Sequence, residues 1–222
     1  MIIDHENKII FFAVPKMAST AITQYLKPVL KNAIFYDSHM LDEMNLYYHH
    51  EWARHCESKF PQFHQYLKIA CVRNPFDWAL SWYTYFCSPY QSKLHTQFRN
   101  MTFLEYLQCE HATNHSIGHY ICNENGHVMV DHIIKFEEDL ETQIRNILLL
   151  KGIHIPLDHK LTQSNVSSLL DIEEGALKQL NDCVELQSCA DIIFKRDCNI
   201  IDKFHYQYYT EGNVKRNFTR ML

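Results

Sequence analysis

The sequence predicts an α/β fold with a central, mostly parallel sheet flanked by helices. Three short apolar runs, at residues 8–14, 67–73 and 131–136, have the length and the continuous hydrophobicity of strands buried on both faces. Each run is followed by a short loop and then by a segment with the apolar periodicity of a helix. Strands that alternate with helices run in the same direction, so this order indicates parallel pairing.

The first strand–loop–helix segment lies at the start of the chain. The run KIIFFAV at residues 8–14 ends at a proline and is followed by PKMAST. Beyond this loop Ile22, Tyr25 and Leu26 fall on one helical face, and Pro28 limits how far the helix extends. We therefore expect a buried strand, a tight loop and a short helix.

The second and third segments repeat this order. LKIACVR at 67–73 is broken by an Asn-Pro pair and followed by the aromatic helix FDWALSWYTYF at 76–86. DHIIKF at 131–136 is followed by EEDLETQIRNILLLKG at 137–152, whose final Gly152 is a helix stop. The apolar stripe of this last helix consists of Leu140, Ile144, Ile147 and Leu148.

Further helices are expected at about 50–60, 101–110 and 173–182, while the polar tail beyond about 160 gives no clear pattern. The chain has 222 residues, of which 46% are hydrophobic, enough for one sizeable core. No internal repeat and no low-complexity tract interrupts it, and only five glycines are present. We therefore expect a single domain over residues 1–222.

Charge and composition exclude several classes of protein. The formal net charge of −5 disfavours general nucleic-acid binding, although a local basic pocket remains compatible with it. The N-terminus lacks the pattern of a signal peptide, and no apolar run approaches the ~18 residues of a membrane span. The eight cysteines contain no CxxC pair and indicate reduced, buried thiols. Together these features predict a cytoplasmic protein without a membrane span; they leave the oligomeric state open.

The loop after the first predicted strand has the features of an anion site. Lys16 ends the strand, and Ser19 and Thr20 open the helix, so the backbone N–H groups of residues 17–20 would converge on one point. A helix N-terminus favours an anion there, and the hydroxyls would donate hydrogen bonds and cap the helix. The NTPase motif GxxxxGK[ST] is absent. The alternative is an ordinary helix start with a solvated lysine.

The loop after the second predicted strand offers a second anion contact. Arg73 stands at the carboxyl end of that strand, where open α/β sheets bind ligands, and a guanidinium grips phosphate with two N–H groups. Ser81 follows eight residues later and could donate to the same phosphate. Alternatively, Arg73 pairs with Asp77 and Ser81 is an ordinary helix serine.

Together, VPKMASTAI and VRNPFDWALSWY resemble the sulfotransferases that use 3′-phosphoadenosine 5′-phosphosulfate (PAPS), in particular the carbohydrate-type branch. The resemblance covers about residues 8–165 and returns at about 205–218. It implies a P-loop-like nucleotide-binding architecture, PAPS as donor, 3′,5′-adenosine bisphosphate as product, and a glycan or small-molecule acceptor with a hydroxyl or an amine. It also implies no metal. In the resemblance the 5′-phosphosulfate loop comprises Lys16, Ala18, Ser19 and Thr20, and the 3′-phosphate contacts are Arg73 and Ser81.

The resemblance also points to the catalytic residues. Lys16 would stabilise charge on the leaving phosphate, and His50, within His50-Glu51-Trp52-Ala53-Arg54, resembles the base that takes the proton of the acceptor. His49 and Glu51 remain alternatives for this base.

The sequence departs from the family pattern at two places. Trp78 stands where the family usually has a basic residue, and residues 168–204 match no recognised segment. Glu137 is expected to orient a neighbouring group or to cap a helix.

A His/Cys-rich segment suggests a different function. His111, His115 and His119 are spaced four apart, so one helix would stack them on one face, with Cys109 and Cys122 nearby. Such a set could hold zinc; the alternative is a polar helix face in a chain with 15 histidines. Two further functions compete with an active sulfotransferase, namely a catalytically inactive sulfotransferase-like interaction module and a nucleotide kinase. The incomplete P-loop argues against the kinase.

Overall fold

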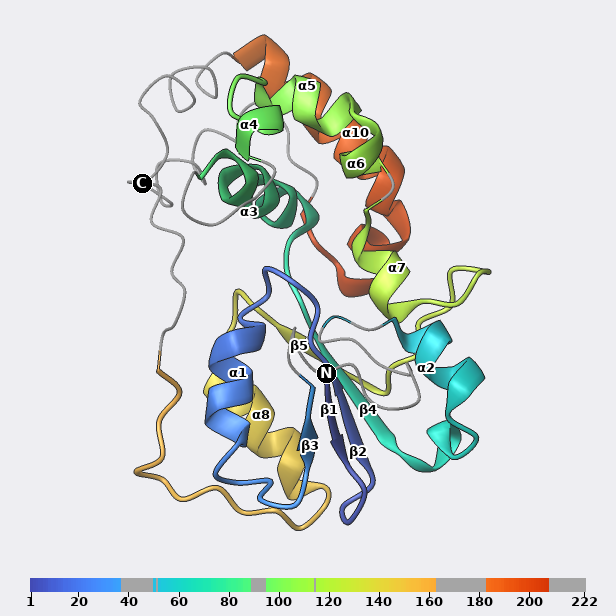
Figure 1. Cartoon of the computed structure of the whole chain (residues 1–222), viewed down its shortest axis with the longest axis vertical. Helices are drawn as coiled ribbons and strands as arrows, with labels where there is room; N and C mark the ends of the chain where they lie inside the picture. The colour runs from blue at the N-terminus through green and yellow to red at the C-terminus, as the bar shows by residue number, and fades with distance from the viewer. Residues whose placement is uncertain (37–49, 51, 89–94, 114, 163–182, 208–222) are drawn as a thin grey trace. The chain divides into compact units, whose positions relative to one another are not determined.

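The computed structural model of the chain describes residues 1–36, 50, 52–88, 95–113, 115–162 and 183–207 (Figure 1). The chain divides into two compact units, one formed by Met1–Arg73 with Ile117–Asn165 and the other by Asn74–Ser116 with Val166–Leu222. The expectation of a single domain over residues 1–222 stays a prediction.

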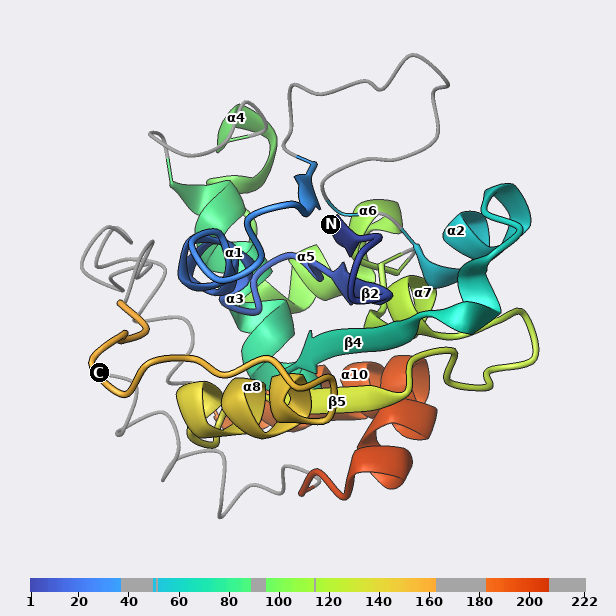
Figure 2. The ribbon, with the colours of Figure 1, turned by 90° about the horizontal axis from the view of Figure 1, so that it is seen from below.

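The first unit contains a five-stranded sheet in the order β3-β1-β2-β4-β5. Its strands are β1 (Ile2–Asp4), β2 (Ile9–Phe12), β3 (Ile34–Phe35), β4 (Leu67–Val72) and β5 (His132–Lys135). β4 pairs in parallel with both β2 and β5, and Figure 2 shows these three strands side by side. The three strands predicted from apolar runs are therefore confirmed.

The mostly parallel sheet expected from the sequence is mixed, because β1 pairs antiparallel with both β2 and β3. β1 was missed since it is only three residues long and is followed by polar residues. The buried Asp4 carboxylate explains the turn that follows, as its Oδ1 accepts the backbone N–H groups of Glu6 and Asn7, both at 3.0 Å. Lys8 then adopts a φ of 54° and closes the hairpin.

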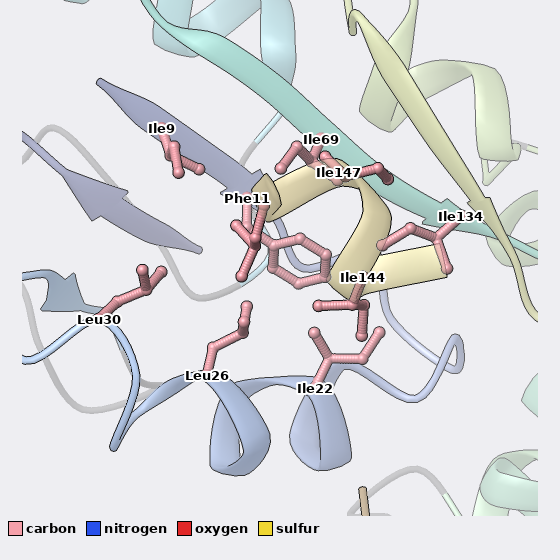
Figure 3. Close-up of a pocket in the computed structure, with 10 residues that line it drawn as sticks. Ile9, Phe11, Ile22, Leu26, Leu30, Ile69, Ile134, Ile144 and Ile147 are labelled. Carbon is pink, nitrogen blue, oxygen red and sulfur yellow. The ribbon is translucent and has the colours of Figure 1, made fainter. Parts of the chain in front are cut away.

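Two of the predicted helices cover one face of the sheet. They are α1 (Ser19–Leu26) and α8 (Leu140–Leu149), and their apolar residues meet those of the strands (Figure 3). A gap of about 10 Å³ lies between them, near the lower limit for one water molecule. Its lining consists of Ile9, Phe11, Ile22, Leu26, Leu30, Ile69, Ile134, Ile144, Ile147 and Leu148. No polar side chain lines the gap, so it is a packing gap of the core and not a ligand site.

The remaining described helices of the first unit are short. They are α2 (Ala53–Lys59), the 3-10 helix η1 (Phe63–Gln65) and α7 (Ile117–Ile121). α2 lies within the helix expected at about 50–60 and packs against α7. The helix that follows His50 closely in the chain is therefore packed against α7, which lies far later in the sequence.

The second unit is helical. Its described helices are α3 (Pro75–Cys87), α4 (His95–Phe98), α5 (Phe103–Gln108), α6 (Glu110–Thr113) and α10 (Cys183–Phe204). α3 and α5 confirm the helices expected at 76–86 and 101–110, and the one expected at 173–182 lies outside the described residues. Within the described residues no helix is both long and apolar enough to cross a membrane.

α10 lies in the region without a family match and packs against α3 and α5. Its helical geometry is interrupted at the buried Asp197, whose carboxylate pairs with Arg196 at 2.7 Å. The Arg196 guanidinium also lies 5.6 Å from the ring centroid of Trp78, which is 1% exposed. Trp78, where the family usually has a basic residue, is therefore a core residue covered by an arginine of α10.

Candidate anion-binding site

The loop between β2 and α1 has an unusual backbone conformation. Lys16 and Ala18 both have a positive φ, of 63° and 54°. A left-handed conformation costs a residue with a Cβ roughly 1–2 kcal/mol, so the surrounding structure holds this loop against its local preference. Loops with such residues turn successive N–H groups toward one point, which makes an anion-binding concavity.

The start of α1 contributes further donors. The Ile22 N–H bonds to the Ala18 carbonyl at 2.9 Å, so Ala18 is the N-cap residue, directly before the first residue of the helix. Ala18 has no capping hydroxyl, which corrects the expectation that Ser19 or Thr20 would cap the helix: both lie inside it. Among the described residues, no turn or loop bond between backbone groups uses the N–H of Met17, Ala18 or Ser19. These donors lie at the positive end of the helix dipole.

Arg73 follows β4 directly, and β4 is the parallel neighbour of β2. Its guanidinium lies 4.5 Å from the ring centroid of Phe136, which is held beside β4 by a 2.8 Å bond from the Phe136 N–H to the Val72 carbonyl. The Nε atom of Arg73 is buried without a hydrogen-bond partner among the described residues. A buried donor left unpaired costs about 1–3 kcal/mol, which a bound anion would recover.

Lys16 and Arg73 act on each other electrostatically. Burial lowers the pKa of the Lys16 ammonium to about 8, and the positive charge of Arg73 contributes to that shift. Two cations that raise each other's energy in a partly buried site favour a bound anion, because its charge relieves the repulsion. Within the first unit Lys16, which lies just before α1 in the chain, is therefore near enough to Arg73 for the two charges to interact, while their binding of an anion stays a prediction.

His50 is attached to the same loop region. Its Nδ1 atom makes a hydrogen bond to the backbone carbonyl of Ala13, three residues before Lys16. A carbonyl only accepts, so Nδ1 must be the protonated ring nitrogen. In the neutral ring Nε2 then carries the lone pair. His49 and Glu51, the alternative bases, lie outside the described residues.

The remaining predicted contacts lie elsewhere in the chain. Ser81 is partly buried in the second turn of α3 and belongs to the second unit. Asn74 caps α3 by accepting the Phe76 N–H at 2.9 Å, which explains why the helix starts directly after Arg73. Glu137 follows β5, and its charge raises the pKa of the buried Cys71 thiol, after the larger effect of burial.

The His/Cys-rich segment does not form the single helix that its spacing suggested. His111 lies on α6 and His119 on α7, with His115 between them outside either helix. The His115 Nδ1 bonds instead to the His111 carbonyl at 2.6 Å, and the centroids of the two rings lie 4.6 Å apart. In the part of the chain that the structure describes, no group of three His, Cys, Asp or Glu side chains is placed to hold a metal ion.

The sequence model of the sulfotransferase family matches residues 1–169, which include the whole sheet, the loop after β2, His50 and Arg73. The chain belongs to the sulfotransferase family. No curated protein and no solved structure matches it.

Two contacts within this sulfotransferase were missed from the sequence. The Ala13 carbonyl that binds His50 is a backbone group, which no residue pattern can reveal. Phe136, whose ring lies against Arg73, appears in the sequence only as the last apolar residue of a predicted strand. Its role depends on the parallel pairing of β4 with β5.

Proposed function

We propose that this sulfotransferase transfers a sulfuryl group from PAPS to a hydroxyl or an amine of a glycan or small-molecule acceptor and releases 3′,5′-adenosine bisphosphate. The observation that carries the proposal is the pair of Lys16 and Arg73. The pKa of Lys16 is lowered to about 8 by burial and by the charge of Arg73. The Nε of Arg73 is buried without a hydrogen-bond partner among the described residues. Such a pair is suited to an anion with more than one phosphate.

In this proposal the residues of the donor site divide into two groups. The N–H groups at the start of α1, with the hydroxyls of Ser19 and Thr20, bind the 5′-phosphate from the loop that Ala18 turns. Arg73 binds the 3′-phosphate through two N–H groups, and Ser81 adds a hydroxyl to the same phosphate. The 3′-phosphate contact is what would distinguish PAPS from ATP.

Transfer requires charge to be neutralised on the leaving group. The bond between sulfur and the phosphate oxygen breaks while a bond between sulfur and the acceptor atom forms, so negative charge grows on that phosphate. The protonated ammonium of Lys16 stabilises this charge. The physical demands are those of phosphoryl transfer, in which the protein mainly positions the reactants and neutralises charge.

The acceptor must lose a proton, and His50 is the proposed base. The Ala13 carbonyl holds the proton of the ring on Nδ1, so Nε2 is the nitrogen that can take the acceptor proton. The same hydrogen bond fixes the orientation of the ring relative to the loop that carries Lys16. The carbohydrate-type branch, the P-loop-like architecture and the cytoplasmic location stay predictions from the sequence.

Calorimetric titration with 3′,5′-adenosine bisphosphate tests the donor site, with 5′-AMP and ATP as controls. We expect selective binding of the bisphosphate. Loss of the charged hydrogen bonds in Arg73→Ala should cost about 1.5–3 kcal/mol, or roughly 10- to 150-fold in affinity. Arg73→Lys should recover only part, because an ammonium cannot bind bidentately. Arg99→Ala removes an exposed arginine and should change nothing.

The alternative is an inactive interaction module that has the family fold without its donor site. Absence of bisphosphate binding by the folded protein would overturn the PAPS assignment and favour this alternative. Equal binding of the bisphosphate and 5′-AMP would show instead that Arg73 and Ser81 do not form a 3′-phosphate site.

A further inference from the structure

Three exposed leucines lie close together where α8 ends. Leu149, Leu150 and Leu157 are 52%, 64% and 84% exposed, more than any other large hydrophobic side chain that the structure describes. Single exposed apolar residues are ordinary, whereas a group of them on one segment marks a surface that another molecule covers. These leucines therefore form the apolar part of an interaction surface of the first unit.

The loop that carries Leu157 is held against α8 and α1. The Arg145 guanidinium donates hydrogen bonds to three carbonyls of this loop, those of Ile155 at 2.6 Å, Pro156 at 3.0 Å and His159 at 2.6 Å. His159 in turn stacks on the Tyr25 ring, with centroids 4.6 Å apart, and donates from Nε2 to the Tyr25 carbonyl at 2.8 Å. These contacts lie on both sides of Leu157 in the chain, so a fixed loop presents its side chain to solvent.

The turn after α1 borders the same segment. Leu30 of this turn lines the packing gap of the core together with Ile147 and Leu148, the residues just before the exposed leucines. Lys27 and Lys31, which flank Leu30 in the chain, are exposed. The ends of α1 and α8 therefore lie on the same side of the first unit, and these lysines border the leucines (Figure 1).

The charge of this face is positive. Residues 24–34 and 146–160 contain four lysines and one aspartate, a formal charge of +3, although the whole chain carries −5. Lys27, Lys31 and Lys151 are exposed and pair with no carboxylate of the described chain, while the fourth lysine has an ion pair. A second copy of the chain would bring its own lysines against these three, because a symmetric dimer pairs a surface with itself. The face is therefore complementary to an acidic partner.

We propose that the face formed by these leucines and lysines binds the surface of an anionic lipid bilayer. This leucine–lysine face consists of Leu149, Leu150, Leu157, Lys27, Lys31 and Lys151. The leucine side chains enter the boundary between the headgroups and the acyl chains, and the lysines attract the negative headgroups. This mode of binding needs no helix that spans the membrane.

The position of the face leaves the proposed donor site open. Lys16 and Arg73 follow the carboxyl ends of β2 and β4, whereas α1 and α8 run back along the sheet and end at its opposite edge (Figure 1). A bilayer bound at the leucine–lysine face therefore does not cover the loop after β2. The inference goes beyond the proposed function and does not depend on it.

Cosedimentation of the intact protein with lipid vesicles tests this face. One set of vesicles contains phosphatidylcholine alone, and the other contains equal parts of phosphatidylcholine and phosphatidylserine. Wild type should bind the anionic vesicles about 100-fold more tightly than the neutral ones, because each of the three lysines contributes roughly fivefold near an anionic surface. The combined change Lys27→Gln, Lys31→Gln and Lys151→Gln should remove this preference. Leu157→Ser should weaken binding to the anionic vesicles about tenfold, whereas Leu157→Met keeps an apolar side chain and should retain it.

Controls separate lipid binding from other effects. Lys195→Gln combined with Lys203→Gln removes two exposed lysines of α10 and should leave vesicle binding unchanged. Urea unfolding should give the wild-type midpoint for every variant, because the changed side chains are exposed. Absence of binding to both kinds of vesicle, or a preference that survives the three lysine changes, would overturn the lipid assignment. Self-association of the wild type that Leu157→Ser abolishes, without vesicle binding, would also overturn it and assign the face to a second copy of the chain.

Discussion

Binding of the donor product should be linked to protonation of Lys16. In the empty site the pKa of this ammonium is about 8, lowered from 10.5 by burial and by the charge of Arg73. A bound bisphosphate adds negative charge beside the ammonium, which favours its charged form and raises the pKa again. Near pH 8 about half of the empty sites lack the proton, so binding should take up roughly half a proton per ligand.

The direction and the size of the pH effect follow from this shift. The charged lysine binds the anion better, so affinity should be highest below the pKa of the empty site and should fall as the pH rises above it. We assume that binding restores the ordinary pKa of Lys16. In the protein without ligand, the ratio of deprotonated to protonated Lys16 then rises tenfold for each pH unit above 8. Affinity should therefore fall about tenfold between pH 7 and pH 9.

Calorimetry in buffers of different ionisation enthalpy measures both quantities. Lys16→Met should bind weakly at every pH and lose the proton uptake, while Lys16→Arg should keep affinity at pH 9 because guanidinium does not titrate there. Lys31→Met removes an exposed lysine and should retain the wild-type profile. A flat profile in wild type, or one that survives in Lys16→Met, would refute the placement of Lys16 at the anion.

Three further predictions concern the base, the loop and the second unit. His50→Ala should lower turnover by about 100-fold or more while bisphosphate affinity stays unchanged, and undiminished turnover would move the base to His49 or Glu51. Ala18 has a φ of 54°, so Ala18→Val should lower the free energy of unfolding by about 1–2 kcal/mol in urea titrations, whereas Ala18→Gly should not. Burial, and to a smaller extent the charge of His115, lowers the pKa of His111 from 6.5 in the folded protein. As the pH falls, His111 is therefore protonated in the unfolded chain before it is protonated in the folded one, so the free energy of unfolding should fall below about pH 6.5. His111→Gln should flatten that dependence of the urea midpoint on pH, and an unchanged dependence would exclude His111 as its source.

Local sequence patterns were sufficient for the parallel part of the sheet. β2, β4 and β5 were predicted because strands covered on both faces are continuously apolar. The hairpin strand β1 could not be predicted, since three residues give no period and its turn depends on a buried carboxylate. β3 has only two residues and is defined by its pairing with β1.

In the His/Cys-rich segment, by contrast, the local sequence pattern predicted a structure that does not form. A spacing of four predicts one face only if the helix is continuous, and here α6 ends before α7 begins. His119 consequently contacts Trp52, while His111 and His115 contact each other. The spacing of the histidines alone could not distinguish one continuous helix from two short ones, because the interruption between α6 and α7 depends on tertiary packing.

The sequence by itself determined which residue types form the proposed donor site, and it indicated the family of the chain. Lys16 and Arg73 each follow an apolar strand, so the chemistry could be read from local order. Only the tertiary structure decided how the two charges interact, because their proximity arises from the parallel pairing of β2 with β4. It also decided which ring nitrogen of His50 is protonated and placed His119 of α7 against Trp52. Contacts between residues distant in the chain depend on the free energy of packing the whole unit, and no local pattern records that quantity.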